Sequence, residues 1–163
     1  MLSPQAISVA TSEPPVFDTT TPASKVRRFS LADLAELGNW LVGRCKERWP
    51  RAGDRMIWGW LNSSMNDQAV CMMRCDKAVG MVRVIREPLE SAVIIEELFC
   101  FAMDGGLDDA AELYPAFRKW AENIRASEWR FGQFSDVPAS ILKERVGGRK
   151  SRTVHYVDTS PKS

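Results

Sequence analysis

Residues 91–106 read SAVIIEELFCFAMDGG, an apolar run that carries two glutamates and ends at Gly105 and Gly106. We expect residues 91–102 to form a strand that the glycine pair terminates. Successive side chains of a strand point to opposite faces. This alternation predicts one face with Ile95, Glu97, Phe99 and Phe101, and an opposite face with Ile94, Glu96, Leu98 and Cys100. Because both faces are largely apolar, the strand is expected at the centre of a sheet.

The rest of the chain divides into strand-like and helix-like segments. Leucines at helical spacing, with Ser30 as an N-cap and Asp33 three positions on, predict a first helix that ends by Pro50. Pro115 predicts that a later helix is regular only from about Tyr114, because proline is tolerated in a first turn and damaging further on. The predicted elements, in chain order, are a strand at 25–29, helices at 31–49 and 56–61, strands at 69–75, 78–85 and 91–102, a helix at 107–126, a strand at 129–134, a helix at 138–146 and a strand at 152–157.

This order predicts a mixed α/β fold, in which a central sheet is covered by helices on both faces. A chain of 163 residues with 45% hydrophobic and 26% charged residues suits one globular domain. Residues 1–24 contain four prolines and few large apolar residues, so we expect an extended or disordered arm there. The domain is then expected at residues 25–158 and a C-terminal tail at residues 159–163.

Charge limits the classes of partner. The 22 basic and 21 acidic residues leave a net charge of +1, which gives no overall attraction to nucleic acid or anionic lipid. The basic cluster of Arg145, Arg149, Lys150 and Arg152 is interpreted as a solvated helix end, with phosphate binding as the alternative. No apolar run approaches the ~20 residues of a membrane span, and the start of the chain lacks a signal-peptide pattern. We therefore expect a cytoplasmic protein without a membrane or nucleic-acid partner.

The residues that most often bind metals are few. Four cysteines lie inside apolar segments without a CxxC pair, so we expect small buried hydrophobic side chains rather than a zinc site. His155 is the single histidine, which excludes a His-rich metal centre. No metal is expected. The cysteines are Cys45, Cys71, Cys75 and Cys100.

The element order and two stretches of sequence resemble the Gcn5-related N-acetyltransferase (GNAT) superfamily over about residues 25–158. The stretch from Ile95 to Gly106 is similar to the family's fourth strand and the acyl-CoA pyrophosphate loop that follows it. The segment ASILKERVGG at 139–148, with TVHYV at 153–157, is similar to the family's last helix and final strand. The resemblance implies a small, divergent GNAT-like member that uses acetyl-CoA or another acyl-CoA as its acyl donor.

The resemblance also implies a set of residues that contact the cofactor. In the family, backbone N–H groups at a helix start hold the phosphates, as a helix N-terminus does in general. This chain departs from the family's loop pattern, since no Arg or Gln stands in the expected place and Asp104, Asp108 and Asp109 surround the glycines. The alternative is a tight turn before a helix that acidic residues cap. The cofactor-contacting residues that the resemblance implies are Phe99, Cys100, Phe101, Gly105, Gly106 and Lys143.

Catalytic residues follow from the same resemblance. The family often uses a glutamate of the fourth strand as a base, and Glu96 and Glu97 are the matching candidates. Burial in an apolar groove would raise the pKa of such a carboxyl toward a useful value, although pairing with Arg83 on a neighbouring strand is the alternative. Lys143 stands at the position where many family members have a tyrosine that acts as the general acid. Tyr156, or Tyr114, is therefore the candidate acid.

Two functions of different classes therefore remain open. The first is an N-acyltransferase that transfers an acyl group to an unidentified amine, with Trp58 and Trp60 where the family's second helix lines the acceptor site. The second is a GNAT-like scaffold without transfer chemistry. That scaffold would be a structural or assembly component, for example of a phage particle in a virion or its host cytoplasm, attached to a protein partner through residues 1–24.

Overall fold

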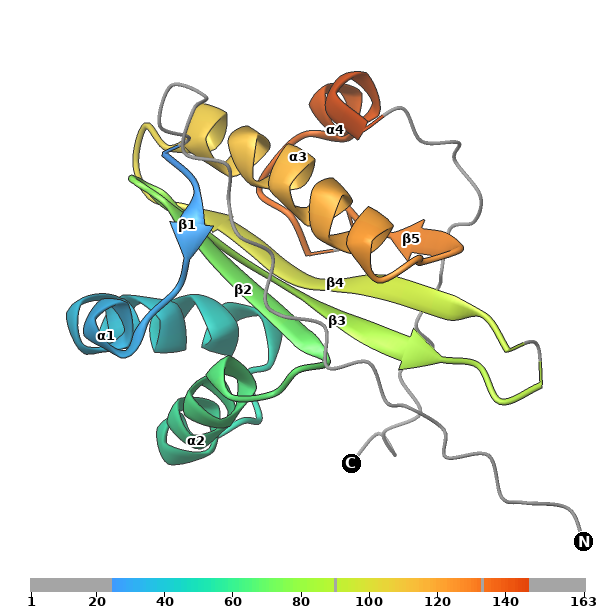
Figure 1. Ribbon diagram of the computed structural model, residues 1–163. Helices are drawn as coiled ribbons and strands as arrows, with labels where there is room; N and C mark the ends of the chain where they lie inside the picture. Colours follow the sequence, from blue (N-terminus) through green and yellow to red (C-terminus); the bar gives the residue numbers. More distant parts are fainter. Residues whose placement is uncertain (1–24, 90, 133, 147–163) are drawn as a thin grey trace, which may run out of the picture.

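The computed structural model has a central sheet with helices on both faces, and it describes residues 25–89, 91–132 and 134–146 (Figure 1). This is the mixed α/β layout that the sequence predicts. The elements are β1 (Arg27–Arg28), α1 (Leu31–Arg48), α2 (Asp54–Met65), β2 (Val70–Cys75), β3 (Ala78–Arg86), β4 (Val93–Ala102), α3 (Leu107–Asn123), β5 (Glu128–Arg130) and α4 (Ala139–Val146).

Among the described residues, the five strands form one sheet in the order β1-β2-β3-β4-β5. Strands β1 to β4 pair antiparallel with one another, and β5 pairs parallel with β4. The predicted hairpin is confirmed, since Cys75 pairs with Ala78 across the turn at Asp76 and Lys77. The central place of β4 is also confirmed, because a strand lies on each side of it.

Each face of the sheet has its own apolar core. Leu113, Tyr114 and Phe117 of α3, with Leu142 of α4, pack on one face. Residues of α1 and α2 pack on the other face, and Figure 1 shows these two helix pairs on opposite sides of the sheet. All four cysteines are buried and unpaired with one another, as the sequence predicts. Within the described part of the chain, no group of three or more His, Cys, Asp or Glu is placed to hold a metal ion.

The start of α1 is fixed by the predicted cap. The Ser30 hydroxyl accepts the Asp33 backbone N–H, and the Asp33 carboxylate accepts the Ser30 backbone N–H, which completes a capping box. The same carboxylate accepts hydrogen bonds from Arg27 of β1 and Arg74 of β2, each at 2.6 Å. One buried aspartate therefore ties α1 to two strands.

A bulge in β4 overturns the predicted alternation of side chains. Met81 pairs with Phe99 but Val82 pairs with Glu97, so Leu98 is an extra residue in β4. A bulge places two residues opposite one and shifts the faces beyond it. Ile95 and Cys100 accordingly pack in the α3 core, whereas Phe99 and Phe101 pack with α1 and α2. The prediction that Ile95, Glu97, Phe99 and Phe101 share one face is wrong.

Three predicted element boundaries also change. The helix over Pro115 is continuous from Leu107 to Asn123, because the packing of its apolar face outweighs the ~3 kcal/mol that an interior proline costs. The second helix is longer than predicted, at Asp54–Met65. The strand predicted at 129–134 is only Glu128–Arg130, since Gly132 adopts a positive φ of 88° and turns the chain.

Several predictions lie outside the described residues. These are the arm at 1–24, the last strand at 152–157 with Tyr156 and His155, and the tail at 159–163. Within the described ranges, no helix is both long enough and apolar enough to cross a bilayer.

Candidate active site

The glycine pair after β4 forms a packed corner. Gly105 has a positive φ of 71°, which favours glycine, and a Cβ at Gly106 would overlap the backbone carbonyl of Lys77. The Met103 N–H donates to that Lys77 carbonyl at 2.8 Å, and the Lys77 N–H donates to the Asp109 carboxylate at 2.9 Å. The two glycines thus allow the start of α3 to lie against the β2–β3 turn.

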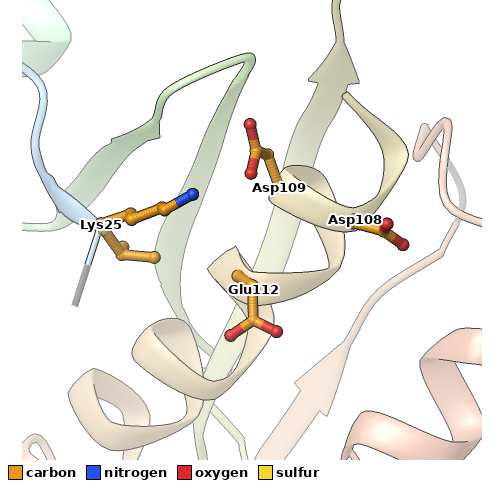
Figure 2. A pocket seen from close by; sticks show the side chains of 5 residues that line it. Lys25, Asp108, Asp109 and Glu112 are labelled. Atoms are coloured by element: carbon orange, nitrogen blue, oxygen red, sulfur yellow. The ribbon is translucent and has the colours of Figure 1, made fainter. Parts of the chain in front are cut away.

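The surroundings of this corner are acidic. A hollow beside the first turns of α3 is lined by Asp108, Asp109 and Glu112, with Lys25 and Val26 across from them (Figure 2). Lys25 Nζ lies 3.8 Å from Asp76, and the amine of Lys77 lies on the Gly105 side of the corner. Carboxylates repel a phosphate, so this side of the helix start favours cations over the pyrophosphate that the resemblance implies.

The edge of β4 next to this corner is covered by the chain itself. The Cys100 N–H donates to the Phe134 carbonyl at 3.1 Å, and the Asp136 N–H donates to the Cys100 carbonyl at 2.9 Å. The Ala102 N–H donates to the Asp136 carboxylate at 2.8 Å. The side chains of Phe99, Cys100 and Phe101 are fully buried. These three predicted cofactor residues therefore offer a ligand only their backbone.

Glu96 pairs with Arg83, as the alternative interpretation of the sequence expects. The two residues are directly opposite in β3 and β4, and both Nε and Nη2 of Arg83 contact Glu96 Oε2, at 2.8 and 2.7 Å. The Glu96 side chain remains about a quarter exposed. Its neighbour Glu97 faces α3, so Glu96 points to the face of the sheet on which α1 and α2 pack.

Glu97 is buried under α3, with 3% of its surface exposed. Its Oε2 accepts the Tyr114 hydroxyl at 2.7 Å and the Gly132 N–H at 3.3 Å, whereas its Oε1 has no partner among the described residues. Burial raises the pKa of Glu97 to about 7, although both hydrogen bonds act in the opposite direction. Tyr114 thus reaches a predicted catalytic glutamate, and its hydroxyl lies 2.7 Å from Ser135 Oγ.

The remaining predicted site residues do not join this group. Lys143 is exposed on α4. Trp58 packs against α1, where a Cβ at Gly38 would overlap its ring. Trp60 contacts Trp49 and Phe99, with ring centroids 5.7 and 6.2 Å away. Trp60 is therefore the one of the two tryptophans that touches β4.

Sequence reasoning missed the residues that cover the β4 edge. Phe134 is the last residue of the strand predicted at 129–134, and Ser135 and Asp136 follow it without any motif of their own. Arg44, which holds Asp136, is 92 residues away in the chain. A contact over that separation leaves no local signal in the sequence.

Comparison with known proteins identifies the fold. No protein-family model and no curated protein matches the sequence. Among solved structures, a probable acetyltransferase matches with a TM-score of 0.63 and 12% identity, over 81% of this chain and 95% of that one. The aminoglycoside N-acetyltransferase AAC(6')-Iy, in complex with the bisubstrate analogue CoA-S-monomethyl-acetylneamine, matches with a TM-score of 0.55 and 15% identity, over 81% of this chain and 95% of that one. A ribosomal-protein-alanine N-acetyltransferase from Brucella melitensis matches with a TM-score of 0.54 and 14% identity, over 81% of this chain and 97% of that one. The chain has the fold of the GNAT acetyltransferases.

Proposed function

We propose that this protein is an acyl-CoA-dependent N-acyltransferase that acts on an amine. The observation that supports this function is the GNAT fold, which the chain shares across 81% of its length with an acetyltransferase bound to a CoA-amine bisubstrate analogue. In the proposed reaction the amine nitrogen attacks the thioester carbonyl, the carbon–sulfur bond breaks, the amine loses a proton, and CoA leaves as a thiol.

Glu96 is the base in this proposal. It is the more exposed of the two β4 glutamates, and Arg83 contacts only its Oε2. The Arg83 side chain holds the carboxylate in one orientation, which is what proton transfer to a positioned base requires. Glu97 is engaged with Tyr114 inside the α3 core and is assigned a structural role.

The acceptor is assigned here only to the class of amines. The solved structures with this fold include enzymes named for an aminoglycoside and for a ribosomal-protein alanine, so the fold alone accommodates acceptors of very different size. The tyrosine acid stays a prediction, since Tyr156 lies outside the described residues.

A GNAT-fold scaffold without transfer chemistry is the second candidate, and specific contacts favour it. The β4 edge is covered by residues 134–136, the start of α3 is acidic, and Gly106 is packed against Lys77. A scaffold needs neither a free strand edge nor a phosphate-binding helix start. Its partner, and attachment through residues 1–24, remain predictions.

Thermal unfolding of the full chain with and without acetyl-CoA separates the two functions. A ligand that binds only the folded state adds about 2.7 kcal/mol at 100 times its Kd, which raises the Tm of a domain of this size by roughly 5–10 °C. The transferase predicts such a rise with acetyl-CoA in the wild type or in Asp136→Ala, a variant that lacks the carboxylate bound by the Ala102 N–H of β4. If the Tm rises in neither protein at millimolar acetyl-CoA, the scaffold is the candidate function that remains.

A further inference from the structure

Two successive stretches of the chain lie along the same edge of β4. Residues Glu128–Arg130 pair with the first half of β4, from Ile94 to Glu96. Farther along the chain, Ser135 forms a parallel bridge with Cys100 beyond the bulge, so both stretches run in the same direction as β4. We call residues 134–136 the strap. The strap, rather than β5, closes the second half of the β4 edge.

The strap is held at its end by Asp136. Its carboxylate accepts the Ala102 N–H at 2.8 Å and lies 2.7 and 2.8 Å from Arg44 Nη2 of α1. The Arg44 guanidinium also lies over the Phe101 ring, 5.0 Å from its centroid. Both charged side chains are less than a third exposed, at 26% for Arg44 and 20% for Asp136. A partly buried, charge-assisted contact of this kind is among the stronger single interactions in a protein.

Ser135 and Phe134 add weaker contacts, and the Phe134 ring lies 5.8 Å from the Trp49 ring and 5.7 Å from the Arg48 guanidinium. Ser135 Oγ lies 2.7 Å from the Tyr114 hydroxyl and accepts the Val137 N–H at 3.0 Å. The strap has only two backbone hydrogen bonds to β4, both at Cys100. Each such bond contributes a net of about 1 kcal/mol. Asp136 supplies the charged contacts of the strap and one of its two backbone hydrogen bonds to β4, so removing the Asp136 carboxylate is expected to loosen the strap.

A ligand at this edge would compete with the strap for the same atoms. The resemblance to acyl-CoA enzymes assigns Phe99, Cys100 and Phe101 to the donor, and their side chains are buried. The donor would have to use the backbone, and the pantetheine arm of CoA carries amides that can pair with a strand edge. The Cys100 N–H and C=O and the Ala102 N–H are already occupied by the strap. The strap and the donor cannot pair with these groups at the same time.

We propose that the strap is an intramolecular occupant of the donor edge of β4, that acyl-CoA binds when the strap is displaced, and that Asp136 holds the strap closed. This inference rests on the proposed transferase function. A protein whose binding-competent form is a minor fraction binds its ligand more weakly by that fraction. Weakening the Asp136 contacts is therefore expected to tighten acetyl-CoA binding without any new contact to the ligand.

Calorimetric titration of acetyl-CoA into the full chain tests the inference in three proteins. The Asp136→Ala variant removes the carboxylate that holds the strap. The Glu47→Ala variant is the matched control, because Glu47 contacts the same arginine at 3.0 Å from the exposed side and does not touch the strap. We expect Asp136→Ala to bind acetyl-CoA at least tenfold more tightly than the wild type, and Glu47→Ala to bind like the wild type. Equal Kd values in the wild type and Asp136→Ala would overturn the inference.

Amide hydrogen exchange gives an independent readout at the strap. The Cys100 and Ala102 amides are expected to exchange faster in Asp136→Ala than in Glu47→Ala, while the β3–β4 amides keep their protection. Where Asp136→Ala does not fold, Arg44→Gln weakens the same ion pair from α1 and is titrated in its place. Faster exchange without any acetyl-CoA binding would overturn the gating role and also argue against the transferase. If the wild type binds acetyl-CoA as tightly as Asp136→Ala does, the proposed role of the strap is overturned and the transferase function is retained.

Discussion

Tyr114 donates its hydroxyl proton to Glu97 at 2.7 Å, across the interface between α3 and β4. Tyr114 is fully buried, and Glu97 is almost so. The pair is a polar contact in an otherwise apolar core, and it adjoins the strap through Ser135. Because the Glu97 carboxyl is buried and its Oε1 has no hydrogen-bond partner in the described part of the chain, the stability of this protein is expected to depend on pH.

The unfolding free energy is expected to fall as pH rises from about 5 to 8. Glu97 has a folded-state pKa of about 7 against 4.5 for an ordinary glutamate, because burial disfavours its charged form. A carboxyl with a raised pKa stabilises the fold below its unfolded-state pKa, and this contribution is lost as pH rises through 7. Its full size is on the order of 3 kcal/mol.

Glu97→Gln removes this titration and keeps an acceptor for Tyr114. Urea unfolding at pH 5, 6, 7 and 8 should show that the unfolding free energy of the variant increases relative to that of the wild type as pH rises. Glu96→Gln is the control on the exposed side of the same strand. Parallel pH profiles for Glu97→Gln and the wild type would show that Glu97 titrates normally.

Asp33→Ala is expected to destabilise the fold by about 3 kcal/mol. The substitution removes the Asp33 half of the capping box and leaves Arg27 and Arg74 without the carboxylate that both contact, and losing one partner of a buried ion pair costs this much. Arg27 and Arg74 hold the pKa of Asp33 well below its usual range. That part of the stability is present above pH 4 and is lost as pH falls further.

Denaturant unfolding at pH 7 measures the Asp33 effect. Glu36→Gln is the control, because Glu36 contacts the same Arg74 from an exposed position and should change stability little. Similar losses of stability in both variants would mean that the Asp33 contacts with Arg27 and Arg74 contribute no more than a surface ion pair.

Gly106→Ala should cost about 1–3 kcal/mol, because the new methyl group would overlap the Lys77 carbonyl oxygen. Gly43→Ala is the matched control. Its Cβ would meet nothing within 4 Å, and alanine in an exposed helix interior is favoured over glycine by up to about 1 kcal/mol. Chemical denaturation compares the two. A Gly106→Ala protein as stable as the wild type would show that the α3 start is not packed as tightly as described.

The sequence predicted the parts of the fold that local rules decide. The N-cap at Ser30, the hairpin over Asp76 and Lys77, and the central place of β4 depend on neighbouring residues, and all three are confirmed. The side chains beyond Leu98 were placed on the wrong faces. A bulge depends on pairing with β3, and an apolar run on both faces contains no sign of where the register shifts.

The candidate site was predicted less completely than the fold. The Glu96–Arg83 pair was foreseen because cross-strand neighbours can be read from two adjacent strands. The depth of Glu97, its contact with Tyr114 and the strap around Asp136 depend on contacts between distant segments. None of these contacts has a periodicity that a single sequence displays.

Transfer of a labelled acetyl group to an amine is the direct test of the proposed transferase activity. The full chain and Asp136→Ala would each be incubated with isotopically labelled acetyl-CoA and a panel of aminoglycosides, polyamines and peptides with free N-termini. Mass spectrometry would then measure the masses of the products. We expect a labelled amide from at least one class of amine. It also predicts a 10²–10⁴-fold lower rate in Glu96→Gln, with Glu87→Gln, a carboxylate of the same hairpin, unchanged. No labelled amide from either protein, together with no acetyl-CoA binding, would contradict the transferase and leave a GNAT-fold scaffold.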